Sequence, residues 1–179
     1  GLSALPSTHR LNKGMLGMHG NLGPNVKTNE CDVLIAIGMR FDDRVTGKLE
    51  TYAKQAKVIH LDIDPSELGK NVPVDVPVLG NCKKTLALLT ELIQNNRHTE
   101  WIESFRQYEE TEFNQVIRKE VFPEEGPLNM GEVVHVISEA TDNDAILVTD
   151  VGQNQMMACR YFKFSRQRSI VTSGGMGTM

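Results

Sequence analysis

The sequence has few cysteines, and they are not grouped as metal ligands or disulfide partners would be. Three occur in 179 residues, at Cys31, Cys82 and Cys159. Their odd number and wide spacing exclude a disulfide framework and a cysteine-based zinc site. No cluster of His, Cys, Asp and Glu has the spacing of a transition-metal site either, so we expect none. Scattered cysteines are typical of small buried residues in a reducing compartment.

Long apolar runs and excess positive charge are also missing. No stretch approaches the roughly 20 apolar residues that span a membrane, and no signal-peptide pattern opens the chain. The net charge of −4 argues against nucleic acid or an anionic membrane as partner. The sequence therefore predicts a cytoplasmic protein that binds neither.

Several catalytic and nucleotide-binding motifs are absent. There is no G-x-G-x-x-G and no lysine-bearing P-loop, so a Rossmann fingerprint and a P-loop ATP site are not expected. Ser169 and Ser173 have no histidine nearby in the sequence that could activate them as nucleophiles. This pattern is consistent with an enzyme in which a cofactor supplies the chemistry and the protein supplies the binding.

What the sequence does contain is an alternation of strands and helices. Apolar runs predict strands over 32–37, 58–64, 144–149 and 168–172, with an extended segment over 72–78. Helices are predicted over 25–30, 48–55, 83–94, 101–119, 130–140 and 155–161. The alternation predicts an α/β fold in which parallel sheets are flanked by helices. The composition changes between 97 and 126, where we place a helical linker between parts of two domains.

A dense charged cluster follows the first predicted strand. Arg40, Asp42, Asp43 and Arg44 lie within five residues, at the carboxyl end of a strand, where ligands bind in open α/β sheets. The arginines could clamp phosphates or a carboxylate, and the aspartates could accept from sugar hydroxyls or hold the arginines. A solvated loop of surface ion pairs is the other interpretation, and the spacing alone does not decide between them.

Three further strand ends carry polar or small residues. Asp62 and Asp64 end the second strand, a little over 20 residues after Gly38. An acidic residue at that distance often accepts from a ribose hydroxyl, so the pair indicates a nucleotide or phosphate site. Gly152 and the glycines at 174 and 175 follow later strands, which predicts a second crevice suited to a diphosphate.

Several motifs stand in the order found in one enzyme family. They are Leu16-Gly17-Met18-His19-Gly20, the run 38–47, His60-Leu61-Asp62-Ile63-Asp64, Gly69-Lys70-Asn71, the run 149–156 and Ser173-Gly174-Gly175-Met176-Gly177. With these motifs the chain resembles the catalytic large subunit of acetolactate synthase (acetohydroxyacid synthase), a thiamine-diphosphate-dependent enzyme. The resemblance covers nearly the whole chain. We interpret the chain as an internal fragment, because it starts without Met and stops at a glycine-rich turn that should open a helix.

The resemblance implies a three-domain parent that uses FAD, thiamine diphosphate and Mg²⁺. The parent would decarboxylate pyruvate and transfer the two-carbon unit to a second 2-oxo acid, pyruvate or 2-oxobutyrate, in branched-chain amino acid biosynthesis. Residues 1–96 would be the C-terminal part of its central FAD-binding domain, 97–126 the helical linker, and 127–179 the start of the thiamine-diphosphate-binding domain. The parent would form dimers or tetramers, with a regulatory small subunit as a further partner.

The resemblance also assigns site residues. Those expected to bind FAD are Leu16, Gly17, Met18, His19, Gly38, Met39, Arg40, Phe41, Asp42, Asp62, Ile63, Asn81 and Cys82. Those expected to bind thiamine diphosphate are Gly152, Gln153, Asn154, Gly177 and Met179. Asp43 and Arg44 would face the substrate channel, in which the family also binds inhibitors.

The chain departs from the family pattern in two cofactor contacts. Asn154 replaces a usual histidine and Asn81 a usual aspartate, so both contacts are expected to differ. The glutamate that activates the thiamine ring and the motif that ligates magnesium lie outside these residues. We therefore expect no catalytic residue in this chain, no activity from it alone, and weak or no cofactor binding by it alone. Pyruvate oxidase, glyoxylate carboligase or a catalytically silent FAD- or nucleotide-binding module are the alternatives.

Overall fold

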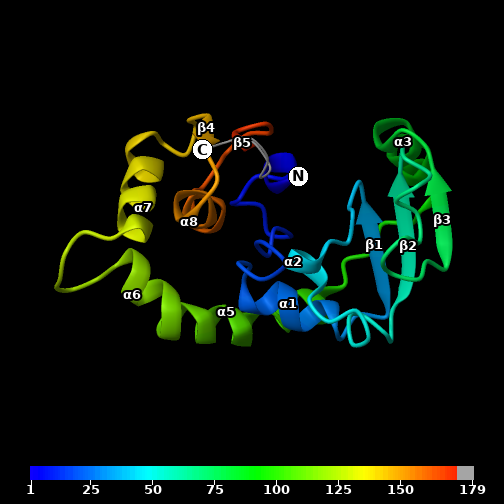
Figure 1. The fold of residues 1–179 in the computed structure, drawn as a ribbon, viewed down its shortest axis with the longest axis horizontal. Coiled ribbons are helices and arrows are strands. Elements are labelled where there is room, and N and C mark those ends of the chain that lie inside the picture. Colours follow the sequence, from blue (N-terminus) through cyan, green and yellow to red (C-terminus); the bar gives the residue numbers. More distant parts are fainter. Residues whose placement is uncertain (173–179) are drawn as a thin grey trace. The chain divides into compact units, whose positions relative to one another are not determined.

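The computed structural model describes residues 1–172, which form two compact units. Unit 1 contains residues 1–24 and the chain from residue 102 onward, and unit 2 contains residues 25–101 (Figure 1). Strands alternate with helices in each unit, and every pair of strands is parallel. The predicted α/β fold with parallel sheets and flanking helices is confirmed, whereas the domain limits near 97 and 126 stay a prediction.

Unit 2 is built on a three-stranded sheet with strand order β1-β2-β3. Its strands are β1 (Val33–Ile37), β2 (Lys57–Asp62) and β3 (Val76–Leu79). Helix α1 (Leu22–Thr28) begins in unit 1 and belongs to unit 2 from Asn25 onward. Helix α2 (Asp43–Thr46) follows β1, and helix α3 (Cys82–Leu92) follows β3. The register places Ile37 beside Leu61, and Asp62 beside Leu79, so all three strands end at one edge.

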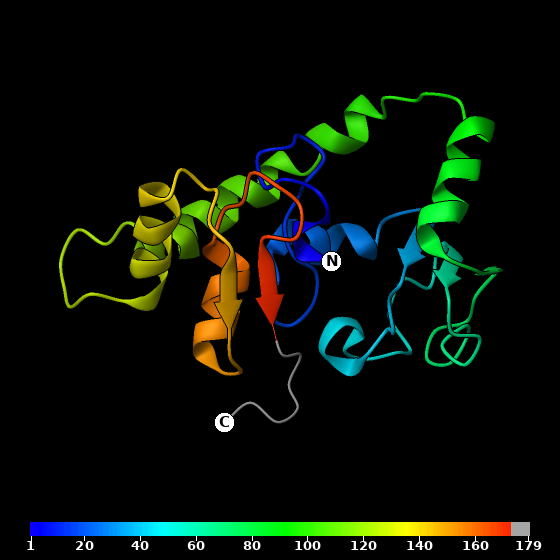
Figure 2. The same cartoon turned by 90° about the horizontal axis from the view of Figure 1, so that it is seen from above.

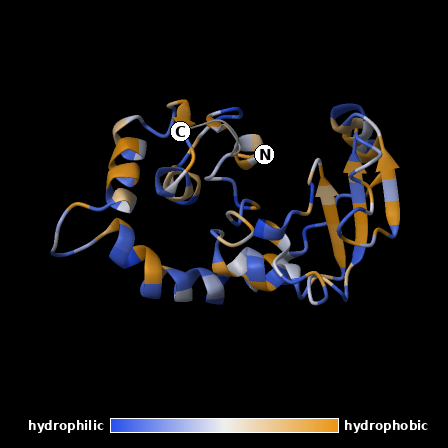
Figure 3. Ribbon diagram, in the orientation of Figure 1, coloured by the Kyte–Doolittle hydropathy of each residue, from blue (hydrophilic) through white to orange (hydrophobic). Residues whose placement is uncertain are grey.

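The two faces of this sheet are covered differently. One face carries the buried core of the unit, formed by Ala36, Phe41, Tyr52, Ala53, Val58 and Val72. On β1 the alternate side chains Val33, Ile35 and Ile37 remain 45–50% exposed. In Figure 3 β1 is coloured as hydrophobic along its length, whereas β2 also carries hydrophilic residues, so the apolar character on both faces that is typical of parallel strands is clearest in β1.

Unit 1 contains a helical run followed by a β-α-β unit. Its elements are η1 (Leu2–Ala4), the end of α4 (Thr99–Glu103), α5 (Arg106–Glu112), the π-helical turn η2 (Phe113–Ile117), α6 (Arg118–Val121), α7 (Met130–Ala140), β4 (Leu147–Thr149), α8 (Gln153–Tyr161) and β5 (Ile170–Thr172). Helix α8 connects the parallel strands β4 and β5, which lie side by side (Figure 2). No helix within residues 1–172 is long and apolar enough to cross a membrane.

Helix α7 begins and ends where the sequence predicts, because local signals determine both ends. The Asn129 side chain accepts a hydrogen bond from the Glu132 amide at 3.0 Å and so caps the helix. At the other end, Thr141 has left the helical conformation. The predicted helix over 130–140 is confirmed.

Two predicted helices differ from those observed. Helix α1 begins at Leu22 rather than Asn25, since the carboxylate of Glu112 accepts from the Leu22 amide at 3.0 Å. The helix predicted over 48–55 is wrong, because the segment forms successive turns. Ala53 there adopts a left-handed φ of 46°, and its amide donates to the Asn29 side chain at 2.9 Å. Both differences come from partners distant in the sequence.

A substitution at Gly131 tests the contact between α7 and α6. Replacing a helical glycine with alanine normally stabilises a helix by about 1 kcal/mol. Here the added Cβ would lie 2.5 Å from the Glu120 carbonyl oxygen, so the helices must separate. We predict that Gly131→Ala destabilises the protein by about 1–3 kcal/mol in urea unfolding. Glu139→Ala, on the exposed side of α7, is the control, and equal stability of Gly131→Ala and wild type would contradict the packing described.

Candidate functional site

The parallel register gathers predicted site residues at one edge of the sheet in unit 2. The Gly38 amide donates to the Leu61 carbonyl at 2.8 Å, and the Gly80 amide donates to the Asp62 carbonyl at 2.8 Å. The ends of β1, β2 and β3 are therefore bonded to one another, and Gly38, Asp62 and Asn81 lie along one edge. This is the edge at which open α/β sheets bind ligands.

The charged loop after β1 is anchored by its one aromatic residue. Phe41 is buried with a φ of 52°, and its ring meets the rings of His60 and Tyr52 edge-on, with centroids 5.1 and 6.2 Å away. Asn71 donates to the Phe41 carbonyl and to the preceding carbonyl, each at 3.1 Å. These contacts fix the backbone of the loop, and the charged side chains on either side of Phe41 lie at the surface.

The charges of this loop form one close ion pair and one cap. The Arg40 guanidinium lies 3.1 Å from the Asp42 carboxylate and is 71% exposed. Asp42 also accepts from the Arg44 amide at 3.1 Å, which caps α2. Asp43 and Arg44 are exposed. Both interpretations of the loop therefore stay open, since an exposed guanidinium held at a strand end can be a surface pair or an anion clamp.

The end of β2 buries a histidine beside an acid. His60 is fully buried, and neither ring nitrogen has a hydrogen-bond partner within the described residues. Its Nε2 lies 3.8 Å from Asp62 Oδ2, while Asp62 Oδ1 accepts from the Asp64 amide at 2.9 Å. A buried polar group without a partner is costly, so His60 lowers the stability of this end of the strand.

These residues fit a flavin nucleotide. A mostly buried carboxylate at the end of β2 and an exposed guanidinium at the end of β1 are groups that ribose and phosphate could contact. The fit is weaker at Asn81, whose side-chain oxygen already accepts from the amides of Lys83 and Lys84. Cys82 is half-buried and Ile63 is exposed on the same edge.

The other predicted flavin residues belong to unit 1. Leu16, Gly17, Met18 and His19 lie in a tight loop over residues 14–21, closed by a hydrogen bond of 2.7 Å from the Asn21 amide to the Met15 carbonyl. Met18 and His19 are exposed. Gly20 is required by this closure, because a Cβ there would lie 2.2 Å from the Met15 carbonyl oxygen.

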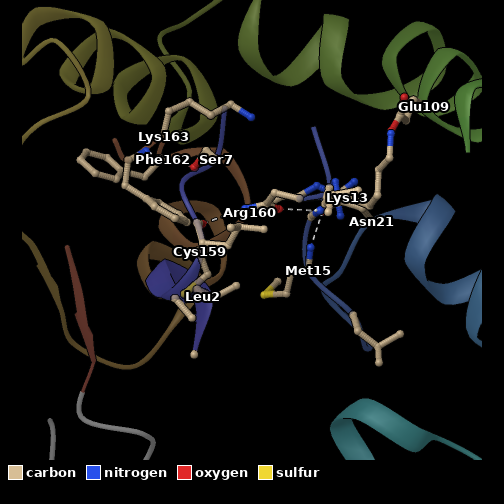
Figure 4. Close-up of a pocket in the computed structure, with 18 residues that line it drawn as sticks. Leu2, Ser7, Lys13, Met15, Asn21, Glu109, Cys159, Arg160, Phe162 and Lys163 are labelled. Carbon is tan, nitrogen blue, oxygen red and sulfur yellow. Dashed lines mark hydrogen bonds and ion pairs between the residues drawn. The ribbon is translucent and has the colours of Figure 1, made fainter. Parts of the chain in front are cut away.

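Arg160 of α8 holds this loop from the side. Its guanidinium donates to the carbonyls of Gly20 and His19 at 2.8 and 3.3 Å and pairs with the buried carboxylate of Glu112. In Figure 4 its side chain extends toward Asn21 and Lys13 of the loop. Glu112 in turn accepts from Asn21 Nδ2 and from the Leu22 amide. The ion pair therefore joins α5, α8 and the 14–21 loop.

A second hydrogen bond fixes the plane of the guanidinium. Arg160 Nε donates to the Tyr161 hydroxyl at 3.0 Å, and that hydroxyl donates to the Glu120 carboxylate. Burial, reinforced by this hydrogen bond to Glu120, raises the pKa of Tyr161 to about 12. Tyr161 is therefore neutral at physiological pH and acts as a donor to Glu120.

A cavity of about 500 Å³ adjoins the loop in unit 1. Its lining includes Leu16 of the predicted flavin residues together with Leu2, Met15, Cys159 and Arg160 (Figure 4). This volume is in the range of small-molecule sites. Burial raises the pKa of the Cys159 thiol, so the cysteine is not activated as a nucleophile.

The start of α8 is a second candidate site. Gly152 occupies the N-cap with a φ of 138°, and no side chain caps the helix. Gln153 and Asn154 form the first turn and are exposed. Uncapped amides at the start of a helix after a parallel strand fit a diphosphate. Gly177 and Met179, the other predicted contacts, lie outside the described residues.

Metal ligands do not cluster in the part of the chain that the structure describes. Residues 1–172 contain no group of three or more His, Cys, Asp or Glu that could hold a metal ion.

The sequence analysis missed three of the residues that organise these sites, namely Glu112, Arg160 and His60. One signal was available: Glu112 stands at i+7 from Phe105 and i+4 from Tyr108, on the apolar side of its helix. A carboxylate at such a position is buried on folding, and a cation beside it is needed to offset the cost of burying its charge. The sequence does not indicate that the cation is Arg160, which lies 48 residues later.

Comparison with known proteins identifies the family. The family described as thiamine pyrophosphate enzyme, central domain, matches residues 1–89. An acetolactate synthase of Mycobacterium bovis is 42% identical over an alignment of 181 positions that covers 98% of this chain. An acetolactate synthase large subunit of Lactococcus lactis is 41% identical over 186 residues that cover the whole chain. The chain belongs to the acetolactate synthase large-subunit family.

The match covers a much smaller share of each relative than of this chain. The isozyme 3 large subunit of Escherichia coli acetolactate synthase is 37% identical over 183 residues, again the whole of this chain but 32% of the relative. The corresponding shares of the M. bovis and L. lactis proteins are 29% and 30%. The resemblance stated from the motifs is thus confirmed, and the chain spans about a third of the length of these acetolactate synthases.

Removing the charge of Glu112 tests the ion pair. Glu112 is 6% exposed and Arg160 is 16% exposed, so Glu112→Gln leaves a buried cation without its counter-charge. We predict a loss of about 3 kcal/mol in the free energy of unfolding, measured by urea denaturation. Glu124→Gln removes an exposed partner of Arg118 and should change stability by less than about 1 kcal/mol. Equal effects of the two substitutions would contradict the role assigned to Glu112.

The raised pKa of Tyr161 predicts a loss of stability at high pH. Because the folded-state pKa of about 12 exceeds the unfolded value of roughly 10, the contribution is fully present below pH 10 and disappears as the pH rises toward 12. Tyr161→Phe lacks this contribution, so the stability difference between wild type and variant should shrink over that range. Unfolding midpoints measured from pH 9 to 12 check this. A constant difference would contradict the assignment.

Proposed function

We propose that this chain is part of an acetolactate synthase. The reaction joins pyruvate to a second 2-oxo acid, pyruvate or 2-oxobutyrate, forms one carbon–carbon bond and releases one CO₂, in branched-chain amino acid biosynthesis. The observation that supports this most strongly is identity of about 40% to acetolactate synthases across the whole chain, not only across the matched central domain.

The proposed enzyme uses thiamine diphosphate, FAD and Mg²⁺. Thiamine diphosphate, when bound, supplies the carbanion-stabilising chemistry of decarboxylation. In this chain the first-turn amides of α8, with Gly152, Gln153 and Asn154, are proposed to bind its diphosphate, which the uncapped start of the helix supports. Arg40 and Asp62 at the sheet edge are proposed to bind and orient the flavin nucleotide.

Asp43 and Arg44 are proposed to face the substrate channel. Both are exposed in the first turn of α2, which Asp42 caps. A guanidinium there can hold the carboxylate of a 2-oxo acid by paired hydrogen bonds. The proposed role is therefore to bind and orient the substrate.

The chain by itself is proposed to be inactive. The resemblance places the activating glutamate and the magnesium ligands outside residues 1–179, and the described residues hold no cluster of metal ligands. The complete enzyme is proposed to be a cytoplasmic homo-oligomer, a dimer or tetramer, to which a regulatory small subunit can bind. The naming of the L. lactis and E. coli relatives as large subunits supports the last point.

Arg40→Ala tests the proposal at the charged loop. Arg40 is 71% exposed and makes one surface ion pair, so its removal should change stability by less than about 1 kcal/mol. If the guanidinium binds the flavin, the full-length protein should lose about tenfold or more in FAD affinity and lose acetolactate formation with it. FAD titration and a pyruvate-consumption assay measure both.

Arg118→Ala is the matched control, since Arg118 is also an exposed arginine in a surface pair. It should leave FAD affinity and activity unchanged. Unaltered FAD affinity in Arg40→Ala would contradict the flavin clamp and leave the loop as ordinary surface. Bound flavin without turnover of any 2-oxo acid in the wild-type protein would contradict the enzyme itself and favour a silent binding module.

A further inference from the structure

The motif Gly69-Lys70-Asn71 is part of the family resemblance but has no place among the cofactor contacts that the resemblance assigns. It lies in unit 2, between β2 and β3. Gly69 turns the chain with a left-handed φ of 73°, and Lys70 pairs with Glu67 at 2.9 Å. Asn71 follows directly, and its side chain reaches back to the charged loop after β1.

The Asn71 side chain binds two successive peptide groups of that loop. Its Nδ2 donates to the carbonyl oxygens of Arg40 and Phe41, each at 3.1 Å. These oxygens belong to the peptide groups before and after the Cα of Phe41. Because peptide groups are planar, the rotation between these two is set by the φ and ψ of Phe41 alone. Asn71 therefore holds the backbone conformation of Phe41.

That conformation needs support from outside the loop. Phe41 has a φ of 52°, which is unfavourable for a residue with a large side chain. Its ring is buried against His60 and Tyr52, and Val72, the residue after Asn71, is buried in the same core. Burial of the ring fixes where Phe41 lies, and the two hydrogen bonds from Asn71 fix how its backbone is turned.

The turn at Phe41 determines where Arg40 lies relative to Asp42. The two charged residues flank Phe41, and the Arg40 guanidinium lies 3.1 Å from the Asp42 carboxylate. Asp42 is also held from its other side, because it accepts from the Arg44 amide and caps α2. A change of φ or ψ at Phe41 would therefore rotate Arg40 away from Asp42 and out of the position in which it is proposed to bind the flavin.

We propose, on the basis of the proposed function, that Asn71 is a positioning residue that holds the left-handed turn at Phe41 and so presents the Arg40 guanidinium to the flavin nucleotide. Every residue in this series of contacts belongs to unit 2. Because the turn is held by contacts within the protein, the backbone that carries Arg40 is not reorganised when the nucleotide binds. Such preorganisation increases affinity.

A double-mutant cycle on the full-length protein tests this role. FAD affinity is measured by titration of the wild type, Asn71→Ala, Arg40→Ala and the double variant. We expect Asn71→Ala to weaken FAD binding by about fivefold, the fold-change that corresponds to one net hydrogen bond. In the Arg40→Ala background the same substitution should weaken FAD binding by less than about twofold, because the side chain that Asn71 positions is gone.

Asn29→Ala is the matched control. Asn29 is also an exposed asparagine of unit 2, and its side chain accepts from the amide of Ala53, another residue with a left-handed φ. Asn29 precedes β1 and Ala53 precedes β2, so this contact lies at the opposite end of the sheet from the charged loop. Asn29→Ala and Asn71→Ala should lower the midpoint of urea unfolding by similar amounts, whereas Asn29→Ala should leave FAD affinity unchanged.

The contrary results are distinguishable. If Arg40→Ala weakens FAD binding but Asn71→Ala does not, the positioning role is overturned while the proposed function stands. The same holds if Asn71→Ala has equal effects in both backgrounds, or if Asn29→Ala weakens FAD binding as much, since a merely structural role gives those results. If Arg40→Ala leaves FAD affinity unchanged, or the wild type binds no FAD, the proposed flavin contact fails and the positioning role fails with it.

Discussion

A carboxylate buried beneath a loop is the constraint on which unit 1 depends. Glu112 is nearly inaccessible to water, and an unpaired charge in that position would be prohibitively costly. Its partners are Arg160 from α8, the Asn21 side chain and the first amide of α1. The hydrogen bonds and the ion pair of this one carboxylate thus fix the start of α1, the 14–21 loop and one side of α8. These three segments lie far from Glu112 in the sequence.

In unit 2 the candidate site is positioned by the backbone pairing of the sheet and not by a buried ion pair. Because the strands are parallel and in register, Gly38, Asp62 and Asn81 fall at one edge without side-chain contacts that select them. The side chains then determine the chemistry that the edge presents, through the exposed Arg40 and the mostly buried Asp62. This division suits a cofactor enzyme, in which the protein binds and orients while the cofactor supplies the chemistry.

Local signals made much of the fold predictable from the sequence. The strands of both sheets, the Asn129 cap of α7 and the α/β class follow from apolar runs and capping residues near in the chain, and the motif order indicated the family. What could not be predicted depends on distant partners. Helix α1 starts early because Glu112 accepts from its first amide, residues 48–55 form turns around Ala53, and Arg160 reaches a loop 140 residues before it.

The most direct measurement is the product balance of the full-length protein supplied with ¹³C-labelled pyruvate, thiamine diphosphate, Mg²⁺ and FAD. Carbon NMR would follow the new carbon–carbon bond, and a gas assay would follow CO₂. The account predicts one acetolactate and one CO₂ for every two pyruvates consumed. Acetate or acetyl phosphate in place of acetolactate, or no consumption of pyruvate at all, would contradict it.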